Sequence, residues 1–241
     1  MHKTISAIVL LFAAIIPRAY SQTLSLPSMD GITVFYRSGR LAESSALQAS
    51  PVAPCLHGSS SFPMCGWGFE TVHQLTENTG SPWGAELAVG YDFLNLRATL
   101  HSNKAYEILG SVQTLPSITL YVSRDLRTRT AVYVGLGTGL LVLKNVRAYD
   151  SSGRVYSIDG NTWALTPSIG ATYRFREAKK SRPGASFFIE ASYEIRDFPS
   201  VAYSLPPDIK TLPSDLPRSL SASGPVLNVG FEINLYRAPA K

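Results

Sequence analysis

Five carboxylates and three arginines are the side chains of this sequence best placed to do chemistry, because they recur within regularly alternating segments. Two neighbouring carboxylates can act as general acid and general base. In a narrow protein interior, carboxylates and guanidinium groups instead form a network of ion pairs, since a buried charge without a partner is costly. We expect such a structural network, provided that the segments enclose an interior, from Glu86, Asp92, Arg97, Arg174, Glu190, Glu194, Arg196 and Glu232.

Three other patterns are too weak to predict a bound cofactor or metal. The glycine-rich run at 135–139 follows no strand-to-helix switch, which a nucleotide-binding loop requires. The acidic stretch 149–161 lacks the ligand spacing of a calcium loop. Cys55 and Cys65, with only His57 between them, are too few for a zinc site. We therefore expect no cofactor and no metal.

The two cysteines favour one local disulfide bond. Cys55 and Cys65 are separated by nine residues and no other cysteine occurs in the chain. In an oxidising compartment, such a pair most simply forms a single bridge.

The first 21 residues have the pattern of a secretory signal peptide. Lys3 precedes an apolar run at 5–16, and Ala19-Tyr20-Ser21 forms a small-x-small cleavage site. The apolar run is too short for a membrane-spanning helix. We expect cleavage before Gln22 and export across the inner membrane.

The composition describes a folded protein with no affinity for nucleic acid. The 241 residues are 45% hydrophobic and 16% charged, which excludes intrinsic disorder. The net charge is +5, and it falls further when Lys3 and Arg18 leave with the signal peptide. A charge this mild predicts no nucleic-acid partner.

Alternation with a period of two runs through most of the remaining chain. One parity of each segment carries bulky apolar side chains, and the other carries mostly Gly, Ala, Ser, Thr and scattered Glu or Arg. The pattern predicts eight strands, at 67–75, 83–93, 96–106, 117–125, 131–143, 163–175, 185–196 and 225–236.

The small polar face identifies the kind of sheet. An eight-stranded ring has room inside only for side chains, so a small polar set suits its interior. The bulky set would then face lipid, which is the signature of a transmembrane barrel. The sequence thus predicts an all-β fold: a transmembrane, antiparallel, up-and-down β-barrel of about eight strands.

The connections between these segments alternate roughly between long and short. Outer-membrane barrels have short periplasmic turns and long outer loops, so both termini would lie in the periplasm. In this arrangement Trp83 and Trp163 lie at the outer rim, whereas Tyr91, Phe93, Tyr173 and Phe175 lie at the periplasmic rim.

The stretch 66–236 resembles the small eight-stranded outer-membrane barrels of the OmpA, OmpX and OmpW type. The resemblance implies a cell outer membrane location in a Gram-negative bacterium, contact with membrane lipid and lipopolysaccharide, and assembly by the outer-membrane insertion machinery. Such proteins carry a C-terminal assembly signal, which the segment 228–235 resembles at Asn228, Gly230, Ile233 and Leu235. The chain departs from that pattern by ending in a tail, 237–241, rather than a terminal Phe.

Residues 22–65 lie outside the alternating pattern. They are rich in Pro and Ser and contain one strand-like piece, Ile32 to Arg37. We interpret them as a periplasmic extension or partial plug that carries the predicted disulfide bond. A ninth strand is the alternative, although it would place the N-terminus outside.

Three functions remain open at this point. The favoured function is a non-enzymatic barrel that gives structural support, interacts through the loops 146–162 and 199–222, or offers a narrow passage. A lipid-modifying barrel enzyme is the second, although adjacent His101 and Ser102 point to opposite faces of a strand, unlike the His and Ser of lipid A deacylase barrels. The third is a soluble periplasmic barrel that binds an apolar ligand, with Leu87, Val89, Ile169 and Phe231 pointing inward. The sequence indicates no ligand and no oligomeric state.

Overall fold

The computed structural model describes residues 29–41, 47–49, 64–76, 81–101, 105–179 and 182–235. The predicted signal peptide, Cys55, Ser102 and the tail 237–241 lie outside these residues. Among the described residues, no helix is long and apolar enough to cross a membrane.

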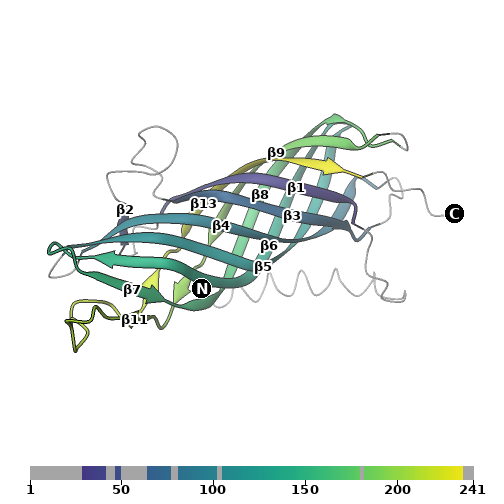
Figure 1. Cartoon of the computed structure of the whole chain (residues 1–241). Coiled ribbons are helices and arrows are strands. Elements are labelled where there is room, and N and C mark those ends of the chain that lie inside the picture. Colours follow the sequence, from purple (N-terminus) through teal and green to yellow (C-terminus); the bar gives the residue numbers. More distant parts are fainter. Residues whose placement is uncertain are drawn as a thin grey trace, which may run out of the picture.

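Eight antiparallel strands form the wall of a closed barrel (Figure 1). Each strand pairs with its neighbours along the wall, and the pairing of β6 with β8 closes the ring. The eight strands are β1 (Gly31–Gly39), β3 (Met64–Gln74), β4 (Trp83–His101), β5 (Ala105–Arg127), β6 (Thr130–Tyr149), β8 (Asn161–Arg176), β9 (Gly184–Glu194) and β13 (Gly224–Asn234). The predicted up-and-down barrel is therefore confirmed.

Five short strands lie outside this ring. β7 (Val155–Asp159) continues the wall beyond β6, and β11 (Ala202–Ser204) pairs with β7. β2 (Leu47–Ala49) pairs with β4. β10 (Asp197–Phe198) and β12 (Leu220–Ser221) pair with each other as a separate two-stranded sheet.

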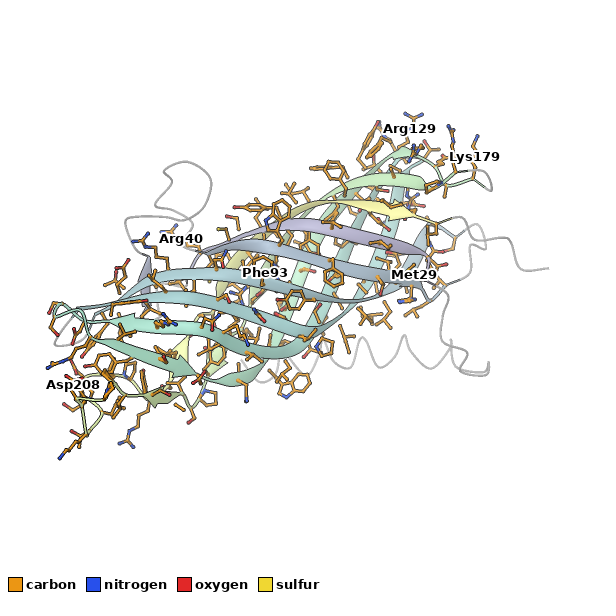
Figure 2. All side chains as sticks on the ribbon, in the orientation of Figure 1. Met29, Arg40, Phe93, Arg129, Lys179 and Asp208 are labelled. Atoms are coloured by element: carbon orange, nitrogen blue, oxygen red, sulfur yellow. The ribbon has the colours of Figure 1, made fainter. Side chains whose placement is uncertain are left out.

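The two ends of the barrel differ. At one end, here called the turn end, lie the short connections β3–β4, β5–β6 and β8–β9, the start of β1 and the end of β13. At the other, here called the loop end, β4, β5 and β6 extend beyond their neighbours and join β7 and β11. In Figure 2 Met29, Arg129 and Lys179 mark the turn end, Asp208 marks the loop end, and Phe93 lies on the wall between them.

The N-terminal boundary predicted for the barrel is wrong. β1 pairs along its whole length with both β13 and β3, with Phe35 opposite Gly230 and Gly68. The barrel therefore begins at residue 31 rather than 66, and the predicted extension 22–65 includes β1 and the start of β3. The number of wall strands stays at eight although β1 is added, because the predicted strand 83–93 and most of the predicted strand 96–106 form the single strand β4.

The predicted turn at 94–95 is also wrong, since 83–101 is the single strand β4. The predicted loop 107–116 lies within β5, where the register with β6 shifts between Thr114 and Ser117. This irregularity accommodates Pro116, which cannot donate a ladder hydrogen bond. Trp83, the first residue of β4, consequently lies at the turn end and not at the outer rim, where it was predicted. Trp163 lies near the start of β8 at the loop end, as predicted.

The outer surface of the barrel is apolar. Large hydrophobic side chains point outward from every part of the ring, with 62% of Ile169, 60% of Phe231 and 51% of Val34 exposed. Inward residues of the same strands, such as Thr33, Glu190 and Asn228, are buried. The proposed soluble barrel with Ile169 and Phe231 inside is thereby contradicted, because both side chains lie on the outside.

The loop end holds a compact apolar core, here called the outer lobe. It is built from the extended parts of β4, β5 and β6, from β7, and from the segment 195–223 that folds against them. Phe198, Val201, Leu216, Leu220 and Ala222 of this segment are buried against wall residues. These wall residues include Leu94, Leu96, Leu100, Tyr106, Ile108, Tyr156 and Ile158.

Candidate functional site

The interior of the barrel contains a cavity of about 960 Å³. Residues of the turn end, including Pro82, Trp83, Asp125 and Glu177, line its mouth. At the opposite limit its wall reaches Arg37 and Glu194, beside the outer lobe. The volume lies within the range of ligand-binding cavities. We take this cavity, here called the lumen, as the candidate site.

A charged cluster closes the lumen where it meets the outer lobe. Arg37 of β1 forms one ion pair with Asp92 of β4 and another with Glu194, the last residue of β9. Glu194 also forms an ion pair with Arg196. All four residues are buried, and Arg196 is fully buried. Charges so far from water are tolerated only when they are paired and hydrogen-bonded.

Further hydrogen bonds tie this cluster to the surrounding wall. The Arg37 Nε–H donates to Asn228 Oδ1 at 3.1 Å, and the Thr114 hydroxyl donates to Asp92 Oδ1 at 3.0 Å. The backbone N–H of Arg196 donates to Ser223 Oγ at 2.8 Å. The cluster thus links β1, β4, β5, β13 and the start of the segment 195–223.

Carboxylates dominate the wall of the lumen below this cluster. Glu70, Glu86, Glu190 and Glu232 line it from four different strands. The Asn228 Nδ2–H donates to Glu190 Oε1 at 2.7 Å, and the hydroxyl groups of Ser168 and Tyr121 interact with the same carboxylate. No ion pair joins any of these four to a basic side chain among the described residues.

The mouth of the lumen carries charges of both signs. Arg174 donates to Asp125 at 2.8 Å, in an ion pair that is more than a third exposed. Arg176 and Glu177 also lie at the mouth. An exposed pair of this kind adds little stability, so it shapes the entrance electrostatically more than it holds the wall together.

Two tyrosines, Tyr121 and Tyr133, line the lumen, and glycines make room for them. The rings of Tyr121 and Tyr133 meet edge to face at 5.2 Å. A Cβ at Gly135 would lie 2.7 Å from the Tyr121 ring, and a Cβ at Gly170 would lie 2.3 Å from the Tyr133 ring. Gly135, in the glycine-rich run at 135–139, therefore makes room for an interior aromatic ring.

Most residues of the predicted network do face the interior. Glu86, Asp92, Arg174, Glu190, Glu194 and Glu232 line the lumen, and Arg196 joins its closing cluster. The inward placement of Arg97 is wrong. Arg97 pairs with Glu107 at 2.7 Å on the outside of the extended β4 and β5, where both side chains are partly exposed.

Sequence reasoning missed Arg37, which holds the two carboxylates of the closing cluster. Its signal was the alternation of the short piece 31–39, whose inward parity continues through Thr33, Phe35 and Arg37. Glu70 was missed in the same way, although its strand was predicted. His101 ends β4, and the described structure gives no arrangement of its side chain with Ser102.

The remaining predicted residues fall in two places. Asn228, Gly230 and Ile233 lie in β13, the last strand of the ring, and Leu235 follows it. Asn228 also has a structural role through Arg37 and Glu190. Cys65 lies in β3, and its bond to Cys55 stays a prediction. No group of three or more His, Cys, Asp or Glu side chains within the described ranges could hold a metal ion.

Comparison with known proteins supports the fold alone. No protein-family model matches the chain, and no curated protein matches it significantly. The structure is similar to the crystal structure of the outer membrane protein OprG from Pseudomonas aeruginosa, with a TM-score of 0.51 and 14% sequence identity over 86% of this chain and 95% of OprG. The chain has the fold of a small outer-membrane β-barrel. The predicted likeness to the small eight-stranded barrels is confirmed.

Proposed function

We propose that the protein is a non-enzymatic outer-membrane barrel, closed to passage, that presents its outer lobe at the cell surface. The observation that carries this proposal is the buried layer of charged and apolar side chains at the loop end. The buried cluster around Arg37 and the apolar core around Phe198 fill the barrel above the lumen. A polar lumen that ends in such a layer favours a structural or surface-interaction role over a narrow passage.

The exposed apolar belt supports membrane insertion. In water, outward side chains such as Ile169, Phe231 and Trp163 would leave a contiguous apolar surface unsatisfied. In an outer membrane the same belt meets lipid and lipopolysaccharide, with the turn end and both termini of the barrel in the periplasm. The signal peptide, and recognition of the segment 228–235 by the insertion machinery, belong to this proposal.

The outer lobe is the part suited to surface interaction. Its packed segment is fixed by the Tyr203 hydroxyl, which donates to the Pro217 carbonyl oxygen at 2.7 Å, and by the Tyr106 hydroxyl, which donates to Asp215 at 3.0 Å. Asp208 at its tip forms an exposed ion pair with Arg154. A rigid lobe offers a partner a defined shape at low entropic cost.

Two measurements test the proposal. Outer-membrane fractionation with boiled and unboiled gel samples should recover the protein in the membrane with a heat-dependent shift. Single-channel recording of the purified protein in planar bilayers should show no steady conductance. A stable conductance in the unmodified protein would contradict closure and favour a narrow passage. Hydrolysis of membrane lipid that is lost on Ser102→Ala would favour the enzyme.

A further inference from the structure

Among the described residues that line the lumen, acidic side chains outnumber basic ones. The closing cluster is neutral when fully ionised, with Arg37 and Arg196 against Asp92 and Glu194. At the mouth, Arg174 is balanced by Asp125. Glu70, Glu86, Glu190 and Glu232 remain on the wall between these two layers, facing a space that opens at the turn end.

An unpaired hydroxyl group on the wall makes this space suited to a polar ligand. Ser117 is 92% buried and lines the lumen, yet its hydroxyl oxygen has no hydrogen-bond partner among the described residues. Buried polar atoms of native proteins are normally paired, so this hydroxyl calls for a partner from outside the chain.

The four carboxylates come from β3, β4, β9 and β13, and among the described residues they form no group of three or more that could hold one metal ion. An extended molecule with several separated positive charges matches this arrangement, because each ammonium group can reach a different carboxylate.

Aromatic side chains between the charges favour an organic chain. Phe35, Tyr121, Tyr133 and Phe188 line the lumen among the carboxylates. The Arg37 guanidinium already lies 5.7 Å from the centre of the Phe35 ring, so the lumen accommodates a cation against an aromatic face. Methylene groups between ammonium groups would pack on such rings.

We propose that the lumen binds a linear organic polycation of the polyamine class, which enters from the turn end and places its ammonium groups against Glu70, Glu190 and Glu232. This binding site is independent of the outer lobe, since the closing cluster separates the two. It adds a binding role to a barrel that is otherwise structural.

The test is calorimetric titration of the folded, full-length protein in zwitterionic detergent with spermidine. We expect saturable binding of about one spermidine per barrel. Hexylamine, with one ammonium group, and Mg²⁺, a compact dication, should each bind at least about tenfold more weakly, since each lost charged hydrogen bond amounts to roughly a factor of ten. Equal affinity for Mg²⁺, or no spermidine binding at millimolar concentration, would overturn the proposal.

Matched variants locate the site. Glu70→Gln and Glu190→Gln preserve shape, and their combination should weaken spermidine binding by at least about tenfold. Glu107→Gln, in the exposed pair with Arg97, removes one carboxylate from outside the lumen and should leave binding unchanged. If the double variant does not fold, Glu232→Gln near the mouth gives the same test. Equal losses in the lumen and Glu107 variants would show surface attraction and reject the site.

Conductance separates this inference from the proposed function. The closing cluster does not include Glu70 or Glu190. We therefore expect the Glu70→Gln and Glu190→Gln variants to lose spermidine binding without any change in conductance. A barrel that stays closed but binds no spermidine refutes only the binding site. A barrel that conducts while it binds spermidine refutes only the closure.

Discussion

Arg37 of β1 and Glu194 of β9 form a buried ion pair inside the barrel, although 157 positions separate them in the chain. The strand between them is β13, whose Asn228 accepts a hydrogen bond from Arg37 and donates one to Glu190 of β9. The first and last strands of the ring, β1 and β13, are therefore linked both by backbone pairing and by this series of side-chain hydrogen bonds. The link forms only when the barrel is closed.

Removal of Arg37 should destabilise the barrel strongly. Arg37→Ala removes the arginine that pairs with both Asp92 and Glu194, and only Glu194 keeps a partner, Arg196. Breaking a buried ion pair costs about 3–5 kcal/mol. Urea titration in detergent or liposomes should show the loss. The matched control is Arg97→Ala, whose partly exposed pair with Glu107 should cost no more than about 1 kcal/mol. Equal effects of the two variants would contradict the role given to the closing cluster.

The outward belt makes a separate prediction about lipid. Ile169 is 62% exposed on β8, and an Arg at a lipid-facing position near the middle of a membrane costs about 2–4 kcal/mol. Ile169→Arg should therefore lower the stability of the protein in liposomes by about that amount. Val155→Arg, an exposed site on β7 of the outer lobe, should change stability by less than about 0.5 kcal/mol. A negligible cost at Ile169 would indicate that this face meets water.

The fold class could be predicted from the sequence because the interior and exterior of the ring differ in side-chain size along most strands. The strand boundaries could not, and β4 shows why. Its inward residues are small or acidic up to Asp92 and mostly large and apolar from Leu94 to Leu100, where the lumen gives way to the outer lobe. The apolar parity therefore switches within one continuous strand. From sequence alone, such a switch resembles a turn followed by a new strand.

β1 and the outer lobe escaped prediction for a different reason. β1 is a single alternating piece flanked by Pro- and Ser-rich sequence, and its place in the ring depends on pairing with β13, some 190 residues away. The core of the outer lobe likewise depends on tertiary contacts of 195–223, a segment whose Pro content suggests only a loop. Neither long-range contact leaves a local pattern in the chain.

The close approach of Tyr133 to Gly170 should make any larger residue at this position destabilising. A Cβ there would lie 2.3 Å from the Tyr133 Cζ and 2.8 Å from the Ile189 carbonyl oxygen. Gly170→Ala should cost about 1–3 kcal/mol through overpacking, measured by urea titration. Combined with Tyr133→Leu, the loss should be smaller than the sum of the two single losses, because the smaller side chain relieves the clash that the new Cβ creates. Strict additivity would show that the two residues do not constrain each other.

Alkaline pH should loosen the outer lobe through Tyr203. Burial raises the pKa of Tyr203 to about 12, and its hydroxyl must keep its proton to donate to the Pro217 carbonyl oxygen. The same phenol titrates near pH 10 in an unfolded chain. Its contribution to stability is therefore complete below about pH 10 and is lost as the pH rises to about 12.

Phenolate absorbance and near-ultraviolet circular dichroism follow this change in the wild-type protein and in Tyr203→Phe. The difference between the two proteins should contain one phenol titrating near pH 12, together with loss of lobe packing. One phenol titrating near pH 10 would place Tyr203 in free contact with solvent and would contradict its burial.

The apolar core should hold the outer lobe in place without holding the barrel together. Phe198 is 1% exposed and lies on β10, outside the eight-stranded ring. Phe198→Ala removes a buried ring, for which core substitutions lose about 3–5 kcal/mol, and here the loss falls on the segment 195–223. Protease should then cleave this segment far faster than in the wild type, while the heat-dependent gel shift of the barrel persists. Because the Arg37 cluster lies below the lobe, the barrel should also stay closed in planar bilayers. Loss of the gel shift would show that barrel and lobe fold as one unit, and a new conductance would show that the lobe, rather than the charged cluster, seals the lumen.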